Sequence, residues 1–482
     1  MDTNGERQEF GMEKLQTGIE RVELCTNAMC VVKRSLTSEL AKRADQLSKV
    51  QTLLVCPPNN RKKKLFMDNY VIKQAGIISR KIRNLSNYNN SQNLVPNVFF
   101  AKTILSEVEF LIKKVPEIYE VNSVEELYIL ELKRYLELIS AFLKRKIVGK
   151  RQNWVEIKEL YYIQDEDLLQ IENWLRSNKE LIFETSNRLL NSDKFANVET
   201  VQWIPNSYKI KEKIEREMLR LVEILVRFTK DTFAKNDDRI AQEFDNYIFD
   251  FNYDIRSSVF RENSKAVLFN MNNIVNFQEG KPIIDFGLFV EHFGHEVWGH
   301  CMNQIMTRIS DLPEFLKIPQ TAASKTIEEL VSIYFEKKIF VVLEEKQDYY
   351  EEFRTNISFA DFIKEYKTIK LMLDYSKKLR DFVMYQVITF NQISETDLLR
   401  RVAKYSLSEE YAKYLVNTNI REYNSGKGFF DDLYFLRYHS LFLDKLISNI
   451  DKSKINKAER AFLTGYWSPD GLKEWINLNI NK

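Results

Sequence analysis

Residues that end regular secondary structure are scarce in this chain, which has 13 glycines and 9 prolines among 482 residues. Folds rich in β-strands need frequent tight turns, and glycine and proline supply many of the backbone geometries that such turns require. The shortage therefore favours long helices joined by few turns. Because 44% of the residues are hydrophobic, the chain can also bury large cores. We predict a mainly α-helical fold.

The pattern along the chain divides it into two parts. Apolar residues recur at three- and four-residue steps in 123–147 and in 165–190, which predicts amphipathic helices. The stretch 192–207 lacks this periodicity and looks like a connection, so we place a domain boundary there. We therefore predict a helical N-terminal region, residues 1–195, whose role is unknown, and a second domain, residues 196–482.

The second domain contains the best candidate for a small β-sheet. Residues 251–259 and 265–275 show short alternating or apolar patterns, which predict strands. We expect the strand at 265–271 to lie at the edge of its sheet, where an extended peptide could pair with it. Helix is predicted at 208–235 and again after residue 286, almost to the end of the chain.

The charge and the cysteine content limit the classes of function and the cellular locations that suit this chain. The chain has 71 Lys and Arg against 69 Asp and Glu, so it gives no global electrostatic case for binding nucleic acid. Its four cysteines, Cys25, Cys30, Cys56 and Cys301, lack Cys-x-x-Cys spacing and are typical of reduced thiols in the cytosol. No apolar run is long enough for a membrane span, and no signal peptide is evident. We expect a cytoplasmic protein.

Three of the four histidines, His292, His295 and His300, lie close together in the sequence. The run HEVWGH at 295–300 differs by one inserted residue from the zinc-binding motif His-Glu-x-x-His. On a regular helix, residues five apart point about 140° away from each other. Both imidazoles can bind one metal only if the helix is locally widened, as in a π-bulge, and Gly299 would supply backbone freedom for that distortion.

Two other interpretations of the histidine cluster stay open. His292 and His295 are neighbours on a regular helix, and so are His292 and Glu296, so a metal site built from these residues would need no bulge. Alternatively, all three histidines are packing or surface residues.

A zinc site needs a third protein ligand, and two acidic residues follow at a suitable distance. Glu328 and Glu329 stand in the first turn of a predicted amphipathic helix, 327–345. Acidic residues are favoured at helix N-termini anyway, because they interact with the helix dipole. After a pair of histidines, however, one of them could complete a site that leaves the fourth zinc position for water.

The chemistry of such a site is hydrolysis. Zinc lowers the pKa of its bound water toward about 7 and polarises a carbonyl group. Glu296, adjacent to His295, could take the proton of the water and pass it to a leaving amine. We therefore predict one Zn²⁺ per chain and a metallohydrolase, most simply a peptidase.

At this point the sequence resembles the zinc metalloproteases with a His-Glu-x-x-x-His motif that include the tyrosine carboxypeptidases acting on α-tubulin. HEVWGH at 295–300 and TIEELVSIYFE at 326–336 occupy the places of two family segments. Looser matches are IREYNSGKGFFDDLYFLRYHSLF at 420–442 and AFLTGYWSPDGLKEWI at 461–476. The resemblance covers residues 250–480, approximately; the N-terminal part matches no family that we recognise.

The resemblance implies a helical, zincin-like domain of the glutamate-ligand type with a small β-sheet. It implies that His295, His300 and Glu329 are the metal ligands, with the second glutamate of the pair preferred over Glu328. It also implies Glu296 as general base. The family's glycine after that glutamate is Leu330 here.

The resemblance also gives expectations for the substrate. The family's helix tyrosine falls at Phe435, and the adjacent Tyr434 is our candidate catalytic tyrosine. A carboxypeptidase needs a cation for the terminal carboxylate of its substrate, and Arg421 is our first candidate. The implied partner is a protein or peptide, such as a tubulin-like C-terminal tail. The alternatives are an aminopeptidase or endopeptidase on the same metal core, or a non-catalytic helical interaction protein with a structural metal site.

Overall fold

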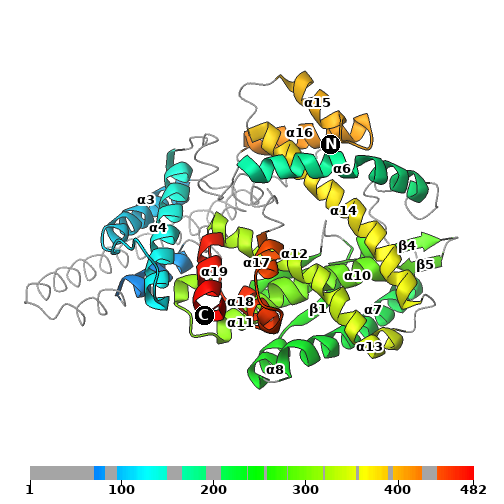
Figure 1. Ribbon diagram of the computed structural model, residues 1–482, viewed down its shortest axis with the longest axis horizontal. Helices are drawn as coiled ribbons and strands as arrows, with labels where there is room; N and C mark the ends of the chain where they lie inside the picture. Colours follow the sequence, from blue (N-terminus) through cyan, green and yellow to red (C-terminus); the bar gives the residue numbers. More distant parts are fainter. Residues whose placement is uncertain are drawn as a thin grey trace, which may run out of the picture. The chain divides into compact units, whose positions relative to one another are not determined.

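Long helices make up most of the computed structural model, as the shortage of turn residues predicts (Figure 1). Within the described residues the fold is mainly α, with a small sheet. The structure describes residues 70–81, 95–148, 165–190, 208–235, 237–253, 258–278, 281–318, 321–353, 358–388, 394–425 and 442–481.

Helices before the sheet lie at all three places where the apolar periodicity predicts them. They are α4 (Val124–Val148), α6 (Asp165–Leu190), and α7 (Tyr208–Thr229) with the π-helical turn η1 (Lys230–Ala234). The structure also has α3 (Val95–Ile112) and α8 (Asp238–Phe244). At the start of α4, the backbone N–H of Glu126 donates to Ser123 Oγ at 3.2 Å. The Glu126 carboxylate accepts the N–H of Asn122 at 3.0 Å, so side chains satisfy two backbone donors that the helix leaves unpaired.

A three-stranded sheet follows, in the order β1 (Ile248–Asn252), β3 (Ala266–Asn270), β2 (Val259–Arg261). Strand β3 pairs in parallel with β1 and antiparallel with β2, and all its residues are buried. The prediction that 265–271 forms a sheet edge is therefore wrong, because both sides of β3 are already paired. The edges of this sheet are β1 and β2.

The predicted strand 265–275 is also interrupted. The side chain of Asn270 accepts the N–H of Asn272 at 2.9 Å and caps the short helix α9 (Met271–Ile274). A separate antiparallel hairpin, β4 (Val275–Gln278) and β5 (Lys281–Ile284), follows. Sequence patterns could not show this break, because an apolar run fits a short buried helix as well as a strand.

Three helical segments then follow one another, α10 (Phe286–Phe293), the π-helix η3 (Gly294–Cys301) and α11 (Met302–Ile309). Helix α12 (Ala322–Glu345) packs against η3. It begins earlier than predicted, because Thr321 and Ser324 form a reciprocal cap. Glu328 and Glu329 therefore lie beyond the first turn, so the helix dipole does not account for them.

The remaining α-helices are α13 (Gln347–Glu352), α14 (Phe359–Ile388), α15 (Glu395–Ala403), α16 (Glu409–Ser425), α17 (Phe442–Ser448), α18 (Ile455–Phe462) and α19 (Pro469–Ile476). Short turns are η2 (Glu262–Ser264), η4 (Glu314–Leu316), η8 (Lys452–Lys454) and the π-helical η9 (Asn477–Asn481). None of the described helices is both long enough and apolar enough to cross a bilayer.

The described helices bury two apolar cores. The larger core joins α3 and α4 to the sheet, the π-helix, α12 and α19, and the smaller core lies between α6, α14, α15 and α16. Helix α14 contributes to both: Phe362 packs in the first and Leu379 in the second. In Figure 1 its far end lies beside α6 and α16.

The described residues all belong to one unit, 68–482. The boundary that we placed at 192–207 lies outside the described residues, so the division into 1–195 and 196–482 stays a prediction.

Candidate metal centre

The helix that carries the histidines is widened where their spacing requires it. Residues Gly294–Cys301 form a π-helix, whose wider turns bring residues five apart onto nearly the same side. The ring centroids of His295 and His300 lie 5.1 Å apart, with the rings at 71° to each other. The distortion that we predicted from the extra residue in the motif is therefore present.

Gly299 has a different role from the predicted one. Its backbone is not left-handed; among the described glycines, the one with a positive φ is Gly465. Instead, a Cβ atom at Gly299 would lie 2.4 Å from the Cα of Ser332, and one at Gly294 would lie 2.9 Å from the Cα of Glu336. Glycine is needed at these positions because α12 passes so close to the π-helix.

This close contact brings Glu329 of α12 to both imidazoles. Its two carboxylate oxygens lie 3.6 Å from His295 Nε2 and 3.4 Å from His300 Nε2. Among the described residues, these three side chains, which we call the triad, are the one group whose candidate ligand atoms all lie within 4.8 Å of one another. Two imidazole nitrogens and one carboxylate are a donor set that suits zinc and leaves a coordination position for water. The residues present therefore fit the predicted metal.

Glu328 occupies a different place from Glu329. Its Oε1 lies 3.3 Å from Nδ1 of His300, on the outer side of that ring. Burial alone would lower the pKa of His300, but Glu328 and Glu329 raise it well above its ordinary value. The carboxylates thus create an environment that favours a cation, either a proton or a metal ion.

Glu296, the predicted general base, is buried beside the triad, with an exposed fraction of 8%. Burial raises its pKa, although the nearby His295 and His300 oppose that shift. Its Oε2 accepts the backbone N–H of Phe260 at 2.7 Å. Phe260 lies in the edge strand β2, and its ring is nearly parallel to that of His300, with centroids 6.4 Å apart. Our sequence analysis missed Phe260, because only the folded sheet brings it to Glu296.

His292 lies outside the triad. Its Nδ1 is 2.8 Å from Ser258 Oγ, and the same hydroxyl accepts the N–H of Asn270 at 3.0 Å. This chain of hydrogen bonds connects α10 to the end of β3. The structure therefore gives His292 a hydrogen-bond partner and does not bring it into the group formed by His295, His300 and Glu329.

No contact within the described part of the structure connects the two remaining predicted site residues, Arg421 and Tyr434, to the triad. Arg421 is exposed on α16, a helix that packs against α14 and α15. Tyr434 lies outside the described residues. Their roles stay predictions.

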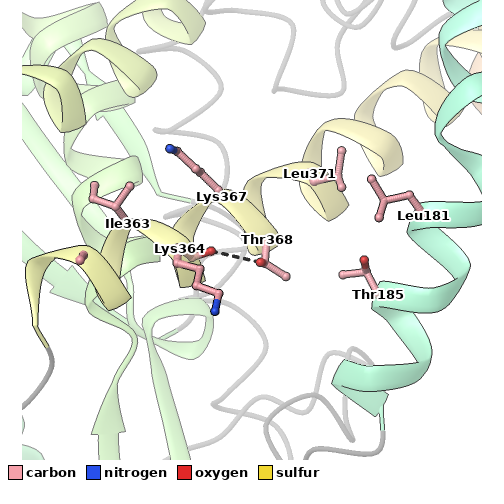
Figure 2. Close-up of a pocket in the computed structure, with 8 residues that line it drawn as sticks. Leu181, Thr185, Ile363, Lys364, Lys367, Thr368 and Leu371 are labelled. Atoms are coloured by element: carbon pink, nitrogen blue, oxygen red, sulfur yellow. Dashed lines mark hydrogen bonds between the residues drawn. The ribbon is translucent and has the colours of Figure 1, made fainter.

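A pocket of about 550 Å³ lies apart from the triad, between α6 and α14, and Figure 2 shows its lining side chains. It is lined by Leu181, Thr185, Ala360, Ile363, Lys364, Lys367, Thr368 and Leu371. None of the triad residues contributes to it, and it offers no cluster of metal-ligating side chains. We therefore do not assign the chemistry to this pocket.

Comparison with known proteins identifies no relative by sequence. The chain matches no protein-family model and no curated protein. One solved structure, a candidate lipoprotein from Colwellia psychrerythraea, superposes with a TM-score of 0.39 and 11% identity over 87% of this chain and 76% of that one. A similarity of this size carries no argument about fold or function.

Proposed function

We propose that this chain is a zinc-dependent peptidase, and specifically a carboxypeptidase acting on a protein or peptide. The supporting observation is the convergence of His295, His300 and Glu329, which the sequence spacing permits only through a π-helix. These three side chains would hold one Zn²⁺. When bound, zinc polarises the scissile carbonyl and lowers the pKa of a water molecule toward about 7.

Glu296 is the proton carrier in this proposal. It follows His295 directly in the π-helix, so its carboxylate stands beside the ligands without being one of them. The Phe260 N–H holds Oε2 in place, and Oε1 is then the oxygen that takes up a proton and returns it to the leaving amine. A pKa raised by burial suits a group that must both accept and release a proton near neutral pH.

The choice of a carboxypeptidase rests on the family resemblance. In this proposal Arg421 would bind the terminal carboxylate, Tyr434 would stabilise the developing oxyanion, and a tubulin-like C-terminal tail is the model substrate. An aminopeptidase or an endopeptidase would use the same metal core with a different substrate-binding surface.

Metal content and hydrolysis measured on the same samples test the proposal. We expect about one zinc per chain in the wild type and in Glu296→Gln, because Glu296 is not a ligand. Hydrolysis should fall by about 10² to 10⁴ in Glu296→Gln, since the proton carrier is lost. The control is Glu344→Gln, an exposed carboxylate near the end of α12, which should leave both quantities unchanged. Zinc-free wild type, or an active Glu296→Gln, would contradict the proposal.

A peptide-library digest separates the alternatives. Peptides with a blocked N-terminus should be shortened from the C-terminus, whereas peptides with an amidated C-terminus should be resistant. Cleavage of doubly blocked peptides would identify an endopeptidase instead, and cleavage only of free N-termini would identify an aminopeptidase.

A further inference from the structure

Behind His295, on the side away from Glu329, lies a buried group of charges from three helices. Glu291 of α10, Glu336 of α12 and Lys370 of α14 have side chains that are only 4%, 2% and 10% exposed. Lys370 Nζ lies 3.1 Å from Glu291 and 3.3 Å from Asp374, and it also forms an ion pair with Glu336. Burying so many charges is costly and seldom stabilises a fold on its own, so the group calls for another explanation.

The two carboxylate oxygens of Glu336 have different partners. Oε1 accepts from Lys370 and from Lys377, the latter at 3.4 Å. Oε2 lies 3.0 Å from Nδ1 of His295. The two lysines thus hold the carboxylate through Oε1, which leaves Oε2 to contact the imidazole of His295.

This arrangement fixes the charge of Glu336. Lys370 and Lys377 both form ion pairs with Oε1, and cationic partners of this kind keep a buried carboxyl group in its ionised form. An ionised carboxylate can only accept hydrogen bonds, so the proton between the two groups must sit on His295 Nδ1. With Nδ1 protonated, the neutral ring that a metal ion requires has its lone pair on Nε2, which faces Glu329.

We propose that Glu336, anchored by Lys370 and Lys377, is a positioning residue that fixes His295 in the Nδ1–H tautomer and thereby sets the affinity of the triad for zinc. The inference rests on the proposed zinc site and adds residues that the motif does not contain. Carboxylates that accept a hydrogen bond from a ligating histidine orient the ring and make it a better donor to the metal.

Glu336→Gln tests this inference, because Lys370 and Lys377 should determine the orientation of the new side-chain amide. Lys370 and Lys377 can only donate, so they should hold the amide oxygen and turn the NH₂ group toward His295. The NH₂ group would then favour a lone pair on Nδ1 and a proton on Nε2, the tautomer that cannot bind zinc through Nε2. We expect zinc affinity, measured by competition with a chromogenic chelator, to fall by about 10- to 100-fold.

Two further variants separate positioning from folding. Glu344→Gln removes an exposed carboxylate from the same helix and should leave zinc affinity unchanged. The double variant Glu336→Gln/Lys370→Met removes one buried charge of each sign, so it should regain stability lost in the single variant while zinc affinity stays low. Lys377 still faces the amide oxygen in the double variant, so recovery of wild-type zinc affinity there would mean that the loss in Glu336→Gln came from lost stability, and it would overturn the proposal.

The tautomer itself can be read by long-range ¹H–¹⁵N correlation spectra of the side chains, because the chain has only 4 histidines to assign. The zinc-loaded wild type should show His295 protonated at Nδ1, and metal-free Glu336→Gln should show it protonated at Nε2. If the wild type binds zinc and Glu336→Gln matches it in affinity and tautomer, this inference is wrong while the proposed function survives. A wild type without zinc would remove both.

Discussion

His295 and His300 differ in the carboxylate that lies beside Nδ1, the ring nitrogen that faces away from Glu329. His295 is held at 3.0 Å by Glu336, whose side chain is 2% exposed and is paired with lysines of α14. His300 faces Glu328 at 3.3 Å, and that side chain is 19% exposed. One outer carboxylate is therefore part of the core, and the other lies at a partly open surface.

The contact of His295 is a hydrogen bond, whereas Nδ1 of His300 lacks hydrogen-bond geometry toward Glu328, so two contacts of similar length should differ in energy. A buried carboxylate neutralises the cations around it, so its removal leaves those cations without compensation in a medium of low dielectric constant. Water can replace much of what a partly exposed carboxylate does. The two sides of the site should therefore respond differently to matched substitutions.

The largest difference should appear in stability. Glu336→Ala leaves Lys370 and Lys377 near a buried void, and we expect it to lower the free energy of unfolding by about 3–5 kcal/mol. Glu328→Ala removes the partner on the more open side, and we expect a loss below about 1 kcal/mol. Urea titrations of both variants in the presence of a chelator measure the difference. Equal losses would show that the burial of Glu336 has no special energetic role.

A smaller difference should appear at the two glycines. An alanine Cβ at Gly299 meets the Cα and side chain of Ser332, whereas at Gly294 it meets the Cα of Glu336 from slightly further away. Both substitutions force α12 away from the π-helix, and overpacking of this kind costs about 1–3 kcal/mol. We expect Gly299→Ala to lower the Tm more than Gly294→Ala. The reverse order would mean that the backbones approach most closely on the His295 side.

Much of the helical fold follows from local sequence patterns. The periodicity of 165–190 predicts α6 at its observed bounds, and the five-residue spacing of His295 and His300 predicts the π-helix. In both cases the information lies within a few turns of one helix. The prediction of Glu329 as the third ligand required the family resemblance as well, because the residues alone do not distinguish Glu329 from Glu328.

The parts that sequence analysis missed depend on contacts between distant segments. Phe260 reaches Glu296 only because β2 pairs with β3, and strand order is not encoded in either strand alone. Lys370 meets Glu336 only because the fold brings this part of α14 close to α12. One signal was available: Glu336 follows Glu329 by two helical turns, so the spacing alone places both on one face of α12.

In the proposed site, His295, His300 and Glu329 would hold one zinc ion, and Glu328 would not be a ligand. The decisive measurement is the zinc content of the wild type, Glu328→Gln and Glu329→Gln after dialysis. We expect about one zinc per chain in the wild type and in Glu328→Gln, and almost none in Glu329→Gln. Retention of zinc by Glu329→Gln, or its loss only in Glu328→Gln, would rule out this set of ligands.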